Sequence, residues 1–346
     1  MINNEVKFIF KIKVISIITV IVIIIFGIVI FFSNKNDLKF SGYDLKKDNL
    51  VLDGNENTEP KVNLFITKDN KIENIKLEEY VRGVISAEMP VEFNIEALKA
   101  QAVAARTYAI AHMGECGGKQ YDKQRNIDLN DTVECQVYIN EKNRLSSWPE
   151  NKRKEYWDKI NDAVNSTRAE VITYSGEPVG EPFFFSCSSG NTENSEDVFI
   201  SSEPYLRSVP SYEDKAAPEY ESTVKITNAD FVSKVNSKYS SSKLQIRNLK
   251  NQINVIKRSE SGSIKEIKVG SITMTGLQFR SILGLHSANI SIKYYSNYVE
   301  LSCKGYGHGV GMSQWGANFM GKSGKTYKEI LKHYYQGVEV GKLKYK

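Results

Sequence analysis

Cysteine, proline and tryptophan are scarce in this 346-residue chain, and charges of the two signs nearly balance. Four cysteines are too few for a disulfide-dense scaffold. The net charge of +5 is too small and too mixed to indicate a nucleic-acid-binding protein. With 41% hydrophobic and 25% charged residues, the chain is neither wholly disordered nor collagen-like, and it is not a polytopic membrane protein.

Two chemical motifs are also missing. No Cys-x-x-Cys pair occurs, so the cysteine spacing is only weak support for a metal site. Gly311 precedes Ser313 by two residues, but Trp315 stands where the Gly-x-Ser-x-Gly elbow of serine hydrolases needs its second glycine, so that elbow is excluded.

One long hydrophobic run is present, at residues 14–32, and it contains no charged residue. At about 1.5 Å per residue it reaches roughly 28 Å as a helix, enough to cross a bilayer core. Lysines in residues 1–13 predict that this tail stays in the cytoplasm, and no convincing signal-peptide cleavage site follows the run. We therefore expect a single-pass anchor at 14–32, a polar stalk at 33–60 and an extracytoplasmic remainder.

The remainder shows both helical and strand periodicity, which predicts an α+β fold. We expect a helix-rich catalytic part at 61–222 and 303–346, with a small α+β subdomain inserted at 223–302. The expected helices are 77–89, 95–113, 156–164, 228–235 (with Asn228 as its N-cap), 276–283 and 327–335. The expected strands are 62–66, 171–174, 224–226, 253–259, 264–270, 290–294 and 298–301.

Glu88 is the first candidate for catalysis. It lies on the apolar face of its helix, one turn after Val84, and Pro90 ends that helix. A carboxyl group placed there loses solvation, which raises its pKa and suits a general acid acting on a glycosidic bond. The commoner alternative for a Glu at a helix end is an ion pair, here with Lys99 or Arg106.

Other polar residues are candidates for substrate binding. Lys99 and Arg106 share one face of the second helix, and Gln101 and Tyr108 share another. In the glycine-rich run, glycine permits close approach of backbone to a ligand. There His308 offers a proton carrier or a hydrogen bond, and Ser313 and Gln314 offer polar contacts to sugar hydroxyls. The alternative for the run is a structural turn before the last helix.

His112, Cys116 and Cys135 could supply three soft ligands to a zinc ion, if the second helix continues past Gly114. A Cys116–Cys135 disulfide is equally compatible with an extracytoplasmic location, and so are free thiols. The residues leave these three alternatives open.

Three segments together resemble the SpoIID family of sporulation proteins. They are LEEYVRGVISAEMP with EALKAQAVAARTYA at 77–109, FFFSCSSGNTE at 183–193, and GYGHGVGMSQWGA with YKEILKHYYQGVEV at 305–340. The resemblance implies a lytic transglycosylase that needs no cofactor for its chemistry and cleaves peptidoglycan during engulfment of the forespore. Its catalytic acid is the Glu of Ala-Glu-Met-Pro, here Glu88.

The resemblance also implies a setting. The substrate would be glycan strands stripped of stem peptides, and the partners a SpoIIP-type amidase and a SpoIIM-type membrane protein. The anchor would hold the catalytic portion on the mother-cell side of the engulfing septal membranes. Because the same module is described elsewhere as an amidase enhancer, the alternative is a non-catalytic glycan-binding module.

The resemblance leaves the structural zinc open. Some relatives look zinc-bound through a Cys/His cluster just before a Cys-Gln-Val-Tyr stretch, which Cys135 begins here. Where another Cys and a His are expected, this chain has Asn130 and Glu134.

Overall fold

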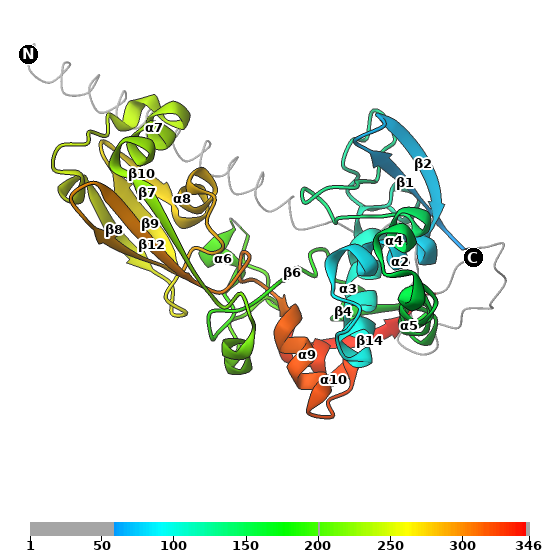
Figure 1. The fold of residues 1–346 in the computed structure, drawn as a ribbon. Coiled ribbons are helices and arrows are strands. Elements are labelled where there is room, and N and C mark those ends of the chain that lie inside the picture. The colour runs from blue at the N-terminus through cyan, green and yellow to red at the C-terminus, as the bar shows by residue number, and fades with distance from the viewer. Residues whose placement is uncertain (1–58, 200, 344–346) are drawn as a thin grey trace, which may run out of the picture. The chain divides into compact units, whose positions relative to one another are not determined.

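The structure is a computed structural model that describes residues 59–199 and 201–343. The predicted tail, anchor and all but the last two residues of the stalk lie outside the described residues. Within them the fold is mixed α+β, as expected from the sequence (Figure 1). Among the described residues, no helix combines the length and the apolar character needed to span a membrane.

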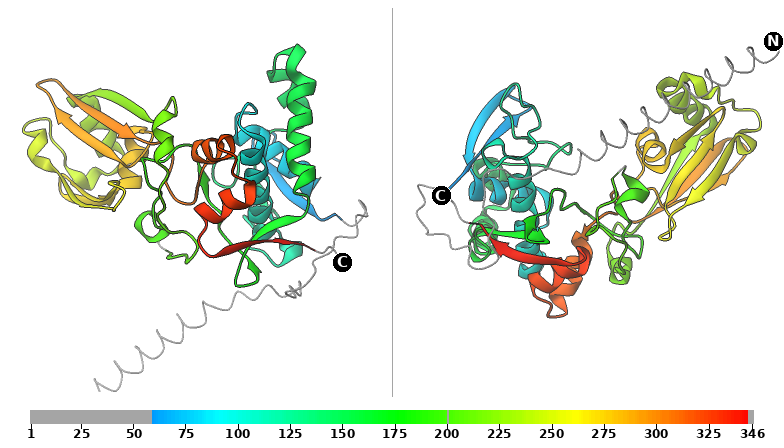
Figure 2. Two further views of the ribbon diagram at one scale, coloured as in Figure 1. Left: turned by 90° about the horizontal axis from the view of Figure 1, so that it is seen from below. Right: turned by 180° about the vertical axis from the view of Figure 1, so that it is seen from behind.

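The helical part is built around α3 (Ile95–His112), against which α2 (Leu77–Glu88), α5 (Arg153–Ser166), α9 (Gln314–Lys322) and α10 (Tyr327–Tyr334) pack (Figures 1 and 2). Alanines along α3 are completely buried, and their small side chains let neighbouring helices approach closely. Asn94 caps this helix, because its side chain accepts a hydrogen bond from the Glu96 N–H. The short helices α4 (Glu141–Ser147) and α6 (Ser195–Val198) lie in loops.

Three small sheets accompany these helices. One has the order β2–β1–β3 (Lys71–Lys76, Lys61–Ile66, Leu129–Asn130), and another the order β14–β4–β5 (Val338–Lys342, Glu170–Tyr174, Glu177–Pro178). The third is a parallel pair of β6 (Phe184–Phe185) and β13 (Met312–Ser313). This pair joins two of the sequence motifs that are far apart in the chain.

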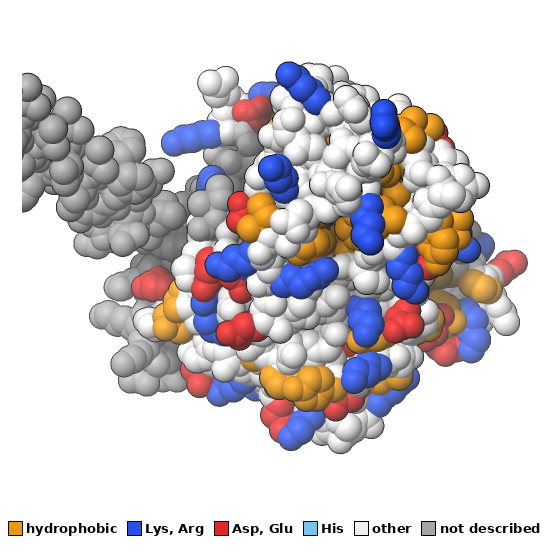
Figure 3. Space-filling model, turned by 90° about the vertical axis from the view of Figure 1, so that its left-hand side faces the viewer, with side chains coloured by type: hydrophobic (Ala, Val, Ile, Leu, Met, Phe, Trp, Pro, Cys, Tyr) orange, Lys and Arg blue, Asp and Glu red, His pale blue; other side chains and the backbone are white. Residues whose placement is uncertain are grey.

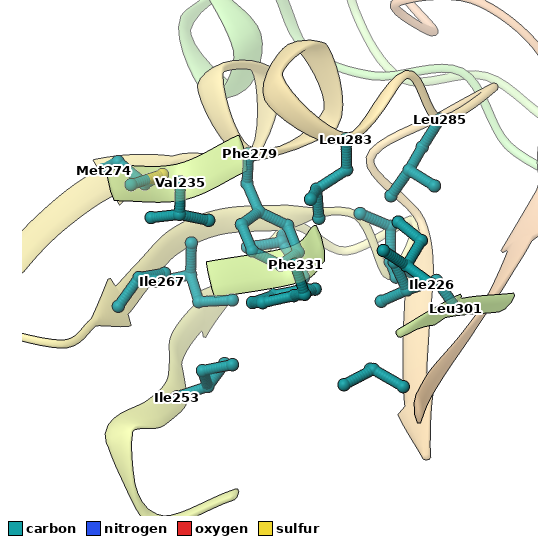
Figure 4. Close-up of a cluster of buried hydrophobic side chains, with 14 of the residues drawn as sticks. Ile226, Phe231, Val235, Ile253, Ile267, Met274, Phe279, Leu283, Leu285 and Leu301 are labelled. Atoms are coloured by element: carbon teal, nitrogen blue, oxygen red, sulfur yellow. The ribbon is translucent and has the colours of Figure 1, made fainter. Parts of the chain in front are cut away.

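Residues 221–304 have a hydrophobic cluster of their own (Figure 4). Phe231 of α7 (Asn228–Lys238) and Phe279 of α8 (Gly276–Leu283) meet in it with ring centroids 6.1 Å apart. The cluster is bounded by two antiparallel sheets of three strands. Their orders are β10–β9–β8 (Ile272–Thr275, Ile264–Val269, Ile253–Arg258) and β11–β12–β7 (Ile290–Tyr294, Tyr298–Lys304, Glu221–Thr227).

One local expectation is wrong, and one helix was not predicted. The N-cap of α7 is Thr227 and not Asn228, since the Thr227 hydroxyl accepts from the Asp230 N–H. The end of the glycine-rich run is the start of α9, where the Ser313 hydroxyl accepts from the Gly316 N–H at 3.1 Å. The many glycines hid that helix, because glycine has low helix propensity.

Candidate active site

Glu88 lies in a pocket of about 370 Å³. The pocket combines a carboxyl group, aromatic rings and a histidine, so it can hold an apolar face of a ligand and exchange a proton with it. Its walls come from the end of α2, from α3, from the loop before α4 and from the two motif segments joined by β6 and β13. The lining residues are Glu88, Tyr108, Val133, Glu134, Cys135, Gln136, Pro182, Phe183, Phe184, Phe199 and His308.

The carboxyl group of Glu88 is held at the last residue of α2, just before Pro90. Burial raises the pKa of Glu88 above its ordinary value, because the charged form loses hydration. The Val137 N–H donates to Glu88 Oε1 at 2.8 Å, which favours the charged form and partly offsets the pKa increase. The group can therefore carry a proton and is also stabilised after losing it.

The segment that supplies the Val137 N–H is fixed against α2 by aromatic packing. Tyr138 stacks on Tyr80 of α2, with ring centroids 5.8 Å apart and 6° between the planes. The Tyr80 hydroxyl donates to Gln136 Oε1 at 3.1 Å. At Gly83 a Cβ would lie 2.1 Å from the Tyr138 ring, so only glycine allows this approach.

His308 forms an aromatic wall of the pocket. Its ring lies 5.7, 5.6 and 5.5 Å from those of Phe183, Phe185 and Phe199. Burial lowers the pKa of His308 to about 4, so the ring is neutral near pH 7. Its Nδ1 accepts from the Val310 N–H at 3.1 Å, which leaves Nε2 as the protonated nitrogen. His308 is thus a neutral hydrogen-bonding group here and not a proton carrier.

The path of the glycine-rich run brings His308 to the phenylalanines. At Gly311, where φ is +79°, a Cβ would lie 2.0 Å from the Phe183 carbonyl oxygen. The run therefore passes β6 at backbone contact distance. The Tyr335 hydroxyl donates to the same carbonyl oxygen at 2.8 Å, so the residue after α10 is also linked to Phe183.

Tyr108 is the residue of α3 that lines the pocket. Its ring stacks on His112, with centroids 4.0 Å apart, and its hydroxyl forms a hydrogen bond with Cys135. Burial raises the pKa of Tyr108, so the phenol stays protonated. It can donate a hydrogen bond to a ligand without a change of charge.

Two predicted substrate-binding residues are placed elsewhere. Arg106 is fully buried and forms an ion pair with Glu78, its Nη2 lying 2.6 Å from Oε2. It also donates to the Glu170 carbonyl oxygen, so its role is to join α2, α3 and β4. Lys99 pairs with Glu96 at 2.7 Å and lies over the Tyr327 ring. Neither residue pairs with Glu88 or lines its pocket, so neither is placed to bind a substrate there.

Gln101, Ser313 and Gln314 are buried and do not line the pocket either. Gln314 Nε2 lies 3.4 Å from Gln101 Oε1, which links α9 to α3. The Ser313 hydroxyl donates to Asp214 Oδ2 at 2.6 Å. These three residues hold α9 and the glycine-rich run in place, so they support the pocket and do not line it.

The suggested zinc ligands do not fit a metal centre. Among the described residues, no three His, Cys, Asp or Glu side chains come together as a metal site would need. His112 Nδ1 lies 2.8 Å from the Tyr108 carbonyl oxygen, and Cys116 is buried in a 3-10 turn after the end of α3. Cys135 is a free thiol, so no Cys116–Cys135 disulfide forms.

Two further residues near the pocket were not singled out from the sequence. Phe199 packs on Phe183 with centroids 4.8 Å apart, and nothing in its local sequence marks it. Burial raises the pKa of Glu181 to about 7, and its charge acts on Tyr108 and Cys135. The sequence signal that could have identified Glu181 is its neighbour Pro182, which starts the PFFFS stretch.

Comparison with known proteins agrees with the sequence motifs. The family model for SpoIID, described as stage II sporulation protein, matches residues 66–174. Stage II sporulation protein D of Bacillus subtilis (strain 168) is 39% identical over 280 residues, which cover 80% of this chain and 78% of that protein. The protein of the same name from Bacillus amyloliquefaciens is 37% identical, with 81% and 78% covered. The chain therefore belongs to the SpoIID family of sporulation proteins.

A more distant relative carries a different description. The amidase enhancer of Bacillus subtilis (strain 168) is 30% identical over 304 residues, which cover 74% of this chain and 39% of that protein.

Proposed function

We propose that this protein is a lytic transglycosylase that cleaves the β-1,4 bond between MurNAc and GlcNAc in peptide-stripped peptidoglycan. The observation that carries the proposal is the placement of Glu88. Its carboxyl group lines an aromatic pocket, and burial raises its pKa. A glycosidic oxygen leaves only when it receives a proton, and a carboxyl group with a raised pKa is suited to supply it.

The reaction needs one carboxyl group. Glu88 first donates its proton to the oxygen that leaves with GlcNAc, and the bond from that oxygen to C1 of MurNAc breaks. The Glu88 carboxylate then takes the proton of the C6 hydroxyl of the same MurNAc, and O6 bonds to C1. This forms a 1,6-anhydro end and restores the acid, without water. The nucleophile is intramolecular, which favours ring closure.

The surroundings of Glu88 support both halves of this cycle. In the first half, burial keeps a fraction of Glu88 protonated. In the second half, the Val137 N–H stabilises the carboxylate that remains. The rings of Phe183 and Phe199 offer apolar surface to a sugar ring, and Tyr108 and neutral His308 offer hydrogen bonds. In this proposal these groups orient the MurNAc unit.

The setting is also part of the proposal. The apolar run at 14–32 would anchor the chain in the cell membrane, with the pocket on the extracytoplasmic, mother-cell side during engulfment. An amidase of the SpoIIP type would remove stem peptides and so generate the substrate. A SpoIIM-type membrane protein would be a second partner.

The alternative is a glycan-binding module that activates a cell-wall amidase and performs little chemistry itself. The similarity to a protein named amidase enhancer favours it. The same pocket would serve both functions, and they differ in what happens to the glycan bond.

Product mass separates them. The full chain in detergent is incubated with amidase-stripped glycan strands, and products are read by mass spectrometry. Transglycosylation yields anhydro products lighter by one water than hydrolytic ones. Products of hydrolytic mass would contradict the proposed mechanism, and intact glycan that stays bound to the protein would favour the binding module.

A further inference from the structure

One face of the sheet β11–β12–β7 packs on the hydrophobic cluster described above, and the opposite face points away from it. Side chains alternate along each strand, so residues at every second position face away from the core. Leu301 and Val299 of β12 are completely buried, whereas the neighbouring positions are not. We call the outward residues the outer sheet face; they are Thr223, Lys225, Ser291, Lys293, Tyr295, Tyr298, Glu300 and Ser302.

These residues form three rows across the strands. One row is Ser291, Ser302 and Thr223, in which the Thr223 and Ser302 hydroxyls lie 3.1 Å apart. The rows are spaced two residues apart, so the face extends about 14 Å from Ser302 to Tyr298 at about 3.4 Å per residue. It therefore offers a track of hydroxyl, charged and aromatic groups.

The second row is cationic at its edges. The ammonium nitrogens of Lys293 and Lys225 lie 3.9 and 3.7 Å from the carboxylate oxygens of Glu300. The two lysine side chains are 67% and 63% exposed. At such exposure each contact contributes little, so both ammonium groups stay available to a ligand. The third row is aromatic: Tyr295 and Tyr298 stack with centroids 4.4 Å apart and 12° between the planes.

The hydroxyl row opens into a pocket of about 490 Å³. Arg258 and Lys304 line this pocket together with the acidic Glu221. The Arg258 guanidinium donates to the carbonyl oxygens of Gly262 and Ile290 at 2.7 and 2.8 Å. Within the described part of the chain it forms no ion pair with a carboxylate, so its positive charge is not neutralised.

The region around this face is strongly basic. Residues 221–304 contain 13 lysines and arginines and 5 aspartates and glutamates, although the whole chain has a net charge of only +5. Figure 3, which views the side where these residues lie in Figure 1, shows more Lys and Arg side chains than acidic ones. An anionic ligand would be attracted to this part of the protein.

We propose that the outer sheet face and its pocket are a second binding surface, for an acidic polysaccharide. Given the function proposed above, on which this inference rests, the occupant is a peptide-stripped glycan strand. Removal of stem peptides leaves lactyl carboxylates on the strand, which match Lys293, Lys225 and Arg258. The serine and threonine hydroxyls match sugar hydroxyls, and a tyrosine ring can pack on the C–H face of a sugar.

The composition of the face favours this occupant over other polyanions. Glu300 and Glu221 stand among the cations, and each would repel a continuous row of phosphates. Carboxylates that occur only on alternate sugars can avoid them. Carboxylates can also accept hydrogen bonds in pairs from an arginine such as Arg258.

The second surface is connected to the Glu88 pocket through the chain. Lys304 precedes His308 by four residues. Ser261, beside the second pocket, donates to Glu193, and the Glu193 N–H donates to the Gly309 carbonyl oxygen at 2.7 Å. A strand held on the outer sheet face is thereby held on the same molecule as the catalytic pocket, which favours strands long enough to reach both.

Binding of fluorescently labelled stripped strands to the full chain in detergent tests this inference. Glu88→Gln is present throughout to prevent turnover. Tyr295→Ala and Lys293→Ala should each weaken binding at least about fivefold. The matched controls are Tyr212→Ala and Lys268→Ala, which change an exposed tyrosine and an exposed lysine elsewhere; these should bind as the parent does. Equal binding by all variants, or equal losses in test and control variants, would overturn the inference.

Two further arms identify the ligand chemistry. Polyphosphate replaces the glycan in one arm, and its binding should respond equally to Lys293→Ala and Lys268→Ala and be unaffected by Tyr295→Ala. If polyphosphate binding instead reproduced the glycan pattern, the surface would be a general polyanion site and the inference would fail.

In the other arm, the product assay is run on Tyr295→Ala with Glu88 intact. Anhydro product from long strands should fall relative to product from short ones. No product from the unsubstituted chain would refute the proposed function and leave the binding result standing.

Discussion

The backbone N–H of Val137 and the carboxyl group of Glu88 are joined by a hydrogen bond of 2.8 Å. It connects the loop before α4 to the last residue of α2, so the candidate acid is held from two sides. Burial and this bond act on the pKa of Glu88 in opposite directions, and burial has the larger effect. Such opposed influences suit a group that must both donate and accept a proton.

The pH dependence of turnover should follow from this balance. Because the first step needs protonated Glu88, kcat/KM should fall as pH rises through the pKa of Glu88, and burial places that pKa above the ordinary 4.5. A pH–rate profile measures this descending limb. Glu134→Gln is the control, since Glu134 also lines the pocket and its removal should leave the limb in place. If the descending limb disappeared in Glu134→Gln, the proton would come from Glu134 and the assignment to Glu88 would be wrong.

Gly83→Ala should impair the active site indirectly, through the segment that carries Val137. Its new Cβ would lie 2.1 Å from the Tyr138 ring and 2.9 Å from the Ile139 carbonyl oxygen, so the segment carrying Val137 must shift. We expect a loss of about 1–3 kcal/mol in stability and a loss of turnover beyond the unfolded fraction. Gly180→Ala is the matched control, because nothing lies within 4 Å of its added Cβ. Urea denaturation and kcat together test this, and unchanged kcat in Gly83→Ala would contradict it.

Much of the fold follows from periodicity. The helix at 77–88 was visible because its apolar residues recur at helical spacing, and Pro90 marks its end. The helix at 276–283 ends before Gly284, which adopts the left-handed conformation (φ 66°), as expected of a C-cap glycine. Strand pairing between distant segments, such as that between β6 and β13, has no signal in a single sequence. Domain boundaries around 223–302 stay a prediction.

Arg106→Ala should destabilise the protein without acting on substrate. The pair with Glu78 is completely buried, so the substitution leaves an uncompensated carboxylate in the interior and costs about 3–5 kcal/mol. Below the unfolding transition, KM should equal that of the unsubstituted chain. Lys99→Ala provides the comparison: its pair with Glu96 is partly exposed and should contribute under about 1 kcal/mol. A raised KM in folded Arg106→Ala would restore its assignment to substrate binding.

Asp214 should make stability depend on pH. Burial raises its pKa from 3.8 to about 6, so the folded state holds the proton more tightly than the unfolded state does. The resulting stabilisation is fully present below about pH 4 and declines as pH rises to about 6, by up to about 3 kcal/mol. Asp214→Asn can keep an acceptor for the Ser313 hydroxyl and should lack this decline. Urea denaturation between pH 4 and 7 measures it; parallel curves for the two proteins would contradict the prediction.

The site was only partly predictable for physical reasons. Glu88 was identified because a carboxyl group on an apolar helix face is unusual, and that signal is local. The burial of Arg106 depends on Glu78, which lies a helix away, so sequence spacing alone suggested a substrate-binding residue. The neutrality of His308 depends on phenylalanines from another segment. Such properties arise only when distant segments pack together.

The most direct test of the central claim compares Glu88→Gln with Glu134→Gln on amidase-stripped strands. The two substitutions remove matched carboxyl groups from the same pocket. The account predicts that Glu88→Gln folds, retains strand binding and loses anhydro product by at least about 100-fold, while Glu134→Gln keeps most of its turnover. Anhydro product formed by folded Glu88→Gln at the rate of the unsubstituted chain would contradict it.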